Sequence, residues 1–174
     1  MAKLAFTKLG LKVNDEIKTI EFNEQAIEVK QYLPVNEKLG VIAEVLNNSA
    51  DDNNFANPVK VDVYTAIAVL EAYTNISFTE KQKENVTKLY DAVISTGLYN
   101  SVIEAIPDDE FGSLNIAIVN TINAFYRYRN SALGILENIS TDYSDLNLDA
   151  SAIQQKLADP EGMELLRSVL SKLG

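Results

Sequence analysis

Carboxylates dominate the side chains of this sequence that could do chemistry, because the chain contains neither histidine nor cysteine. It therefore lacks the commonest general base, the commonest transition-metal ligand and every thiolate nucleophile. Ser-His-Asp and Cys-His catalytic arrangements and zinc sites built on sulfur are excluded. We predict a protein that is not an enzyme and that needs no cofactor and no metal.

Two short acidic clusters are the remaining candidates for chemistry. Residues 51–54 (Asp-Asp-Asn-Asn) offer oxygen ligands for calcium, but the glycine and the distal glutamate of a calcium-binding loop are missing. Residues 108–110 (Asp-Asp-Glu) could supply paired carboxylates for acid–base work or for magnesium. They directly follow Pro107 and precede a helical pattern, so capping of a helix N-terminus explains them better. An enzyme that acts through Asp108 or Asp109 is the weaker alternative.

Residues 126–129 (Tyr-Arg-Tyr-Arg) hold two of the three arginines of the chain. Arginine and tyrosine are favoured anchors at protein interfaces, which makes Tyr126, Arg127 and Arg129 candidate partner-binding residues. Consecutive helical residues do not share a face, however, and the two arginines could instead pair with acids of the same chain. Both interpretations stay open.

Composition favours protein partners over nucleic acid or membranes. The chain of 174 residues has a net charge of −10, and residues 1–38 are neutral, with six lysines and six acids. Such a surface repels phosphate backbones and anionic membranes. No apolar run approaches the roughly 20 residues that span a bilayer, and no secretory signal is visible at the N-terminus, so we expect the protein to stay inside a cell.

Apolar residues alternate along the first 33 residues, as is typical of strands. Leu9, Leu11 and Val13 form one alternating set, and two further sets follow at Ile20 and Phe22 and at Ile27 and Val29. The breaks Asn14-Asp15 and Asn23-Glu24 tolerate turn dihedrals. The pattern predicts an antiparallel hairpin or a three-stranded meander, which must lean on the rest of the domain or have its edge completed by a partner strand.

From Pro34 onward the signals are helical. Asn36, Asn57 before Pro58, and Thr79 with Gln82 are helix N-terminal signals, and Gly97 suits a helix end. They predict helices that begin after these residues, one of them running from Thr79 to Gly97, and a short helix follows at residues 101–106. The longest pattern covers residues 108–139 and is apolar around much of its circumference, so we expect this helix at the centre of the domain.

The C-terminal part is predicted to be separate. Residues 140–149 are polar and predicted to be a linker, and residues 150–174 are predicted to form a helix pair. One face of the last helix carries Met163, Leu166, Leu170 and Leu173, which either pack on the domain or bind a partner. The domain itself is predicted to be residues 1–139, with the hairpin or meander at residues 1–33 and a bundle of about six helices at residues 34–139. The fold class is therefore α+β, mainly α.

Two stretches resemble a known group of proteins: residues 27–34 (IEVKQYLP), followed by Glu37-Lys38-Leu39, and residues 53–58 (NNFANP). This entry from strand through proline into helix resembles small proteins encoded in the structural-gene modules of tailed bacteriophages of Gram-positive bacteria, especially tail assembly chaperones. The resemblance implies a non-enzymatic protein of virion morphogenesis that binds tail or capsid proteins, located in the cytoplasm of a bacterial host or in the virion.

Two alternatives stay open. The long helix and the C-terminal helix pair depart from a small tail assembly chaperone, so a virion head or head–tail component fits too. The acidic surface would equally suit a regulatory protein that binds a host or phage protein. Self-association into a homo-oligomer is compatible with all of them.

Overall fold

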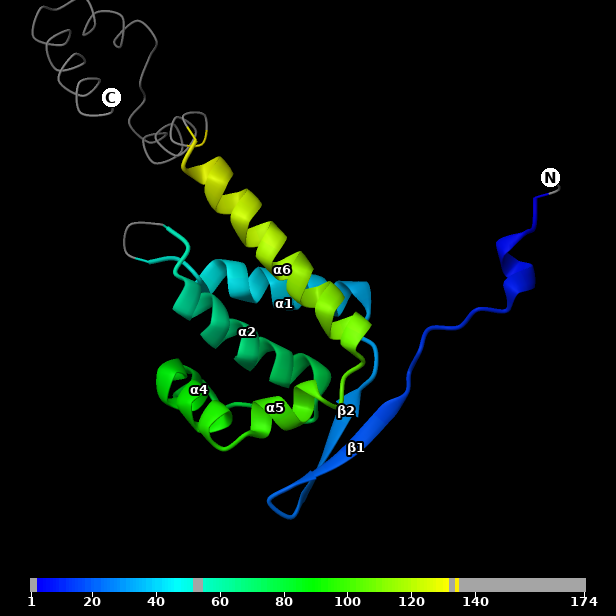
Figure 1. Ribbon diagram of the computed structural model, residues 1–174, viewed down its shortest axis with the longest axis horizontal. Coiled ribbons are helices and arrows are strands. Elements are labelled where there is room, and N and C mark those ends of the chain that lie inside the picture. The colour runs from blue at the N-terminus through cyan, green and yellow to red at the C-terminus, as the bar shows by residue number, and fades with distance from the viewer. Residues whose placement is uncertain (1–2, 52–54, 132–133, 135–174) are drawn as a thin grey trace, which may run out of the picture. The chain divides into compact units, whose positions relative to one another are not determined.

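The computed structural model describes residues 3–51, 55–131 and 134 (Figure 1). The chain divides into two compact units, Met1–Tyr126 and Arg127–Gly174. All the strands and helices described belong to the first unit, apart from the last turn of the final helix. The predicted linker at residues 140–149 and the predicted helix pair at residues 150–174 lie outside the described residues.

The fold begins with an antiparallel hairpin of β1 (Ile17–Phe22) and β2 (Gln25–Lys30), followed by helices, so the class is α+β and mainly α, as predicted. Ile20 lies opposite Ile27, and the two strands are joined by Asn23 and Glu24. Both turn residues have positive φ, 48° and 63°. Positive φ at both positions is required by the two-residue turn whose twist matches that of the two flanking strands. The predicted turn at Asn23-Glu24 is confirmed.

Of the two arrangements expected for residues 1–33, the hairpin forms and the three-stranded meander does not. Residues 3–13 make an exposed segment with one short 3₁₀ helix, η1 (Phe6–Leu9), that ends at Gly10 with φ of 61°. Alternation of apolar residues produces a strand only where a neighbouring strand completes the ladder, and β1 pairs with β2 alone in the part of the chain that the structure describes. The segment with the alternating residues Leu9, Leu11 and Val13 therefore has no partner strand in the described part of the chain.

The hairpin leans on the helices, one of the two arrangements expected for it. Its buried face carries Ile27 and Val29, of which Val29 is fully buried. Polar contacts add to this packing, since the Glu28 N–H donates to Asn75 Oδ1 at 3.2 Å and Gln31 Nε2 donates to the Ala105 carbonyl at 3.0 Å. A two-stranded hairpin is marginal by itself, so these contacts stabilise it.

Six α-helices follow in the described residues: α1 (Val35–Asn48), α2 (Pro58–Tyr73), α3 (Glu80–Lys83), α4 (Val86–Ser95), α5 (Leu98–Ile103) and α6 (Asp108–Arg129). The Asn57 side chain caps α2, and Thr79 forms the predicted capping box with Gln82. The predicted single helix from Thr79 to Gly97 is wrong, because the Asn85 side chain accepts the Lys88 N–H and so starts a new helix, α4.

The predicted start of the first helix is also slightly wrong. Pro34, and not Asn36, is the residue that precedes α1, and no side chain caps this helix. Proline sets its own φ near the helical value, so the chain can turn into a helix directly after it.

The centre of the first unit is α2 and not the long helix, which corrects the prediction. Eight residues of α2 are buried, including every residue from Thr65 to Leu70. The long helix α6 buries only one face, and Ile116 and Val119 on its other side are 63% and 44% exposed. The number of apolar residues on a helix does not reveal which of its faces has a neighbour.

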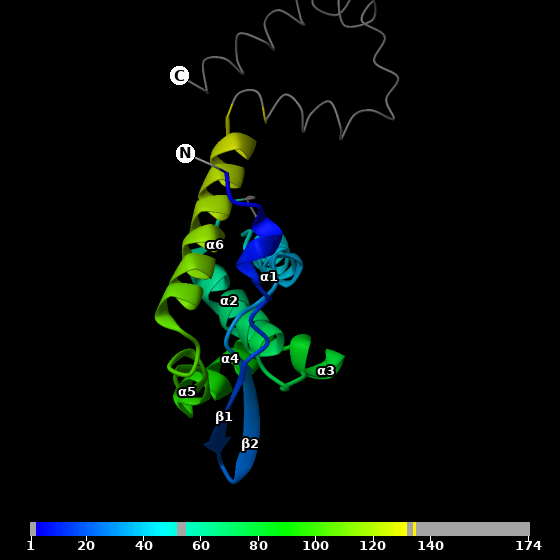
Figure 2. The ribbon, with the colours of Figure 1, turned by 90° about the vertical axis from the view of Figure 1, so that its right-hand side faces the viewer.

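The long helix crosses α1 and ends earlier than predicted. Glu110 contacts Lys38 near the start of α1, and Tyr126 contacts Ser49 just after its end. Figure 2 shows α6 running past α1, which is seen nearly end-on. The helix ends at Arg129, not at Ile139, because the Tyr128 carbonyl accepts the N–H and the hydroxyl of Ser131. Among the described helices, none combines the length and the apolar character needed to cross a membrane.

Candidate functional site

Residues 3–13, here called the N-terminal arm, expose more apolar side chain than the segments around them. Every residue of the arm is exposed, and its large apolar side chains keep 50% to 72% of their surface: Leu4, Phe6, Leu9, Leu11 and Val13. Burial of one such side chain stabilises an association by about 1.5–3 kcal/mol. Soluble monomers rarely expose large contiguous apolar patches, so the N-terminal arm is a candidate binding element.

Charge separates the N-terminal arm from the rest of the chain. The arm carries Lys3, Lys8 and Lys12 and no acid. The remaining residues hold twelve basic and twenty-five acidic side chains, a net charge of −13. A basic apolar segment is therefore attached to an acidic body, and the two are electrostatically complementary.

A groove of about 270 Å³ opens at the foot of the N-terminal arm, here called the arm-base groove, and it is lined by Val13, Asn14, Asp15, Glu16, Ile17, Lys30, Tyr32, Pro34 and Glu37. It contains three carboxylates and one ammonium group, and Lys30 Nζ lies 2.7 Å from Glu37 Oε2. Its apolar walls come from Val13 and Ile17, which are 70% and 54% exposed. The groove is therefore acidic and partly apolar.

One carboxylate, Glu110 at the start of α6, holds the segment that forms the far wall of this groove. It accepts the Leu33 N–H at 2.8 Å, Lys38 Nζ at 2.7 Å and the Tyr73 hydroxyl at 2.9 Å. Lys38 also lies 4.8 Å from the centre of the Tyr32 ring, a cation–π contact. These bonds fix Tyr32 and Pro34 on either side of the anchored Leu33 amide.

The electrostatics of this carboxylate are those of a structural clasp. Burial by itself would raise the pKa of Glu110, but hydrogen bonds from Lys38, from the Leu33 backbone and from Tyr73 outweigh it and lower the pKa. Burial and the bond to Glu110 raise the pKa of Tyr73 well above its usual range. At neutral pH the pair is an ionised carboxylate and a neutral phenol, and neither is poised to transfer a proton.

Further exposed apolar side chains lie on two helices. Val35 and Leu39, one turn apart on α1, are 62% and 58% exposed, and Ile116 and Val119 lie on the outer side of α6. Residues three or four apart share a helix face, so each pair forms a small apolar strip. These strips are candidate contacts for other proteins.

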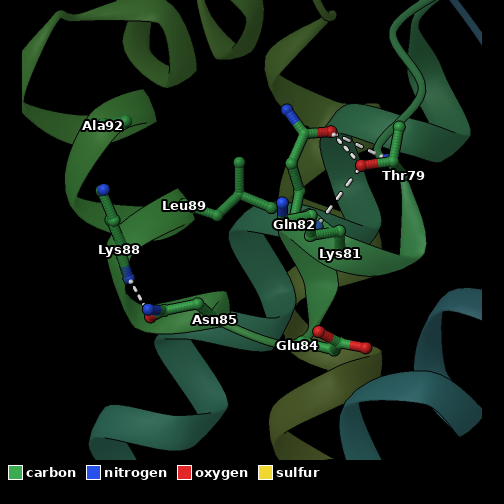
Figure 3. Close-up of a pocket in the computed structure, with 8 residues that line it drawn as sticks. All are labelled: Thr79, Lys81, Gln82, Glu84, Asn85, Lys88, Leu89 and Ala92. Carbon is green, nitrogen blue, oxygen red and sulfur yellow. Dashed lines mark hydrogen bonds between the residues drawn. The ribbon is translucent and has the colours of Figure 1, made fainter.

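A wide hollow of about 830 Å³ between α3 and α4 lacks the features of a catalytic site (Figure 3). Gln82 is bonded back to Thr79, and Asn85 caps α4 through the Lys88 N–H, so both are engaged in shaping helix ends. The remaining lining residues are mostly exposed, and Leu89 and Ala92 form the apolar part. The polar side chains of Thr79, Gln82 and Asn85 cap helices and do not converge on a point where a ligand could bind.

The acidic clusters of the sequence do not assemble into an ion site in the described residues. Asp108 and Asp109 are exposed in the first turn of α6, where they complement the helix dipole as predicted. Asp51 Oδ1 accepts the Phe55 N–H at 2.9 Å across the following loop. Over residues 3–51, 55–131 and 134, no group of three acidic side chains could hold a metal ion.

The partner-binding residues predicted near the end of α6 divide in two. Tyr126 is buried, with 6% of its surface exposed, and its hydroxyl lies 3.2 Å from Ser49 Oγ, so it is a core residue and does not fit a role at a partner surface. Arg127 is exposed and Arg129 is half-buried. Met163, Leu166, Leu170 and Leu173 lie outside the described residues.

Sequence reasoning missed both the arm-base groove and the clasp of Glu110. The partners of Glu110 lie 37 to 77 residues away along the chain, and no local pattern announces such contacts. The exposed lysines and apolar residues of the N-terminal arm did carry a signal, because no acid interrupts them.

In comparisons with protein-family models, curated proteins and solved structures, nothing matched this chain.

Proposed function

We propose that this chain is a non-enzymatic bacteriophage protein of virion morphogenesis, which binds other virion proteins as a tail assembly chaperone or adaptor. The observation that carries the proposal is the apolar surface left exposed on the N-terminal arm, α1 and α6. The resemblance of residues 27–34, 37–39 and 53–58 to proteins of phage structural modules supports the phage context.

In this role the protein would cover apolar surface of an unassembled virion protein until assembly. The strip of Ile116 and Val119 is suited to that contact, because it is exposed on a helix whose opposite face is anchored in the core. The acidic charge of the body keeps such a complex dispersed in solution.

The test is copurification with the products of neighbouring structural genes. We expect the tagged chain to capture a tail or capsid protein, and the double change Ile116→Asp with Val119→Asp to reduce capture at least about tenfold, because two charges would enter an apolar contact. Val59→Asp is the matched control, since Val59 is 69% exposed at the start of α2 and lies away from the strip.

Two results would contradict this function. One is capture of no product of the neighbouring genes. The other is normal particle assembly after deletion of the gene. Detection of the protein in purified particles would instead favour a head or head–tail component.

An acidic regulatory protein that binds a host or phage protein is the second candidate, and the net charge of −10 favours it. Salt separates the two. A complex held by charge should lose much of its affinity between low and moderate salt, whereas an apolar contact should lose little.

A further inference from the structure

We infer that the N-terminal arm of one copy of this chain docks in the arm-base groove of a second copy, so that two copies exchange arms. A second copy is then the partner of the arm, and this docking does not depend on the proposed phage role. It rests on the exposure of the arm, the charge of the groove and the position of the groove at the foot of the arm.

The surface of the N-terminal arm is not covered within the single chain. Residues 3–13 are exposed throughout, including Phe6 at 72% and Leu11 at 66%. The hydrogen bond from the Lys8 N–H to the Ala5 carbonyl is local to η1. Residues 3–12 therefore do not line the groove of their own chain, and their apolar side chains would gain burial by entering the groove of another copy.

Charge identifies a second copy as a suitable occupant of the groove. The groove presents Asp15, Glu16 and Glu37 against the single ammonium group of Lys30. The arm brings Lys8 and Lys12 next to Leu9 and Leu11, with no acid to oppose them. A basic apolar segment and an acidic groove with apolar walls are complementary in both respects.

Position makes the exchange reciprocal. Val13 ends the arm and also lines the groove, so arm and groove adjoin in each copy. A two-fold axis close to this point would place each arm over the other copy's groove, and both contacts would be identical, as in other isologous dimers. Ten extended residues reach about 33 Å, which is ample for this crossing.

The first measurement is the solution mass of the purified full chain by sedimentation or light scattering. We expect a dimer, and we expect Leu11→Asp to raise its dissociation constant at least about tenfold because a charge replaces a buried apolar contact. Val59→Asp, an equally exposed apolar residue outside arm and groove, should leave the mass unchanged. Circular dichroism confirms that each variant is folded.

Charge reversal gives the decisive test. An arm variant, Lys8→Glu with Lys12→Glu, opposes like charges in its own dimer, and so does a groove variant, Asp15→Lys with Glu37→Lys. Each variant alone should dissociate to monomers. An equimolar mixture should recover the dimer mass, since each arm then meets a groove of opposite charge.

Three outcomes would overturn the inference: a monomeric wild type, a dimer that survives the arm changes, or a mixture that stays monomeric. Each of these results leaves the capture of virion proteins through Ile116 and Val119 to be judged by its own assay. If the chain forms the arm-dependent dimer but captures no virion protein, the proposed function is refuted and the exchange of arms still stands.

Discussion

Three donors that lie far from Glu110 along the chain converge on its carboxylate: the Leu33 N–H, the Lys38 ammonium and the Tyr73 hydroxyl. The Glu110 side chain is 10% exposed, so water cannot replace these bonds freely. Glu110→Gln should lower the free energy of unfolding by about 1.5–3 kcal/mol, because hydrogen bonds to a charged acceptor are lost. Urea unfolding at pH 7 measures it, and Asp109→Asn, an exposed acid of the same turn, should have a much smaller effect.

The same carboxylate has a defined pH signature. Its folded-state pKa lies below its ordinary value of 4.5, so its stabilisation is complete above that value and is lost as pH falls through the folded pKa. The difference in stability between wild type and Glu110→Gln should therefore shrink below pH 4.5. A difference that is constant across this window would show that the charge of Glu110 contributes nothing.

Two buried hydroxyl groups should respond to removal with opposite sign. Thr65 Oγ1 is buried in α2 and has no hydrogen-bond partner among the described residues. Thr65→Val keeps the shape and should raise the free energy of unfolding by about 1 kcal/mol. Ser49 Oγ instead bonds the Leu46 carbonyl and contacts the Tyr126 hydroxyl, so Ser49→Ala should lower it by about 1 kcal/mol. Destabilisation by Thr65→Val would contradict this account.

At the scale of elements, the hairpin turn holds a residue in an unfavourable conformation. Glu24 has φ of 63°, a left-handed value that costs a side chain free energy and that glycine adopts readily. Glu24→Gly should raise the free energy of unfolding by about 0.5–1 kcal/mol, after allowance for the greater freedom of glycine in the unfolded chain.

Thermal unfolding measures the effect of Glu24→Gly. Glu28→Gly, in the extended backbone of β2, is the control and should destabilise. A lower melting temperature for Glu24→Gly would mean that the Glu24 side chain makes a contribution larger than its backbone strain.

Elements that depend on near neighbours could be predicted from sequence. Asn57 before Pro58 and Thr79 with Gln82 set helix starts through bonds that span two or three residues, and the structure contains both. The alternation of Leu9, Leu11 and Val13 has the period of a strand but does not reveal whether a partner strand exists. For that reason the sequence left the hairpin and the three-stranded meander open as alternatives.

At the scale of the whole molecule, the missing information is which surfaces meet. The apolar surface of the long helix predicted a central position, yet α2 fills the centre because α1, α4 and α5 all pack against it. The clasp of Glu110 joins segments 37 to 77 residues apart, and no pattern within a few residues encodes their proximity. The arm-base groove lies between residues 13–17 and 30–37, which the predicted hairpin brings together, but the sequence pattern does not show that a groove opens there.

The distribution of charge is also a property of the whole molecule. A basic arm and an acidic body within one chain attract between copies as well as within one copy. Salt in the buffer should therefore influence self-association more than it influences folding, because the core is apolar and its main clasp is shielded. The mixing of arm and groove variants tests this arrangement directly.

The distance along the chain between Leu33 and Glu110 has a consequence for biosynthesis. A ribosome adds about 5–20 residues per second, so the 77 residues between these partners take about 4–15 s to appear. During that time the hairpin, α1 and the phenol of Tyr73 have emerged without the carboxylate that joins them. The N-terminal arm is synthesised before all of them. A nascent chain therefore exposes its apolar arm to neighbouring chains on the same messenger before the hydrogen bonds of Glu110 can form.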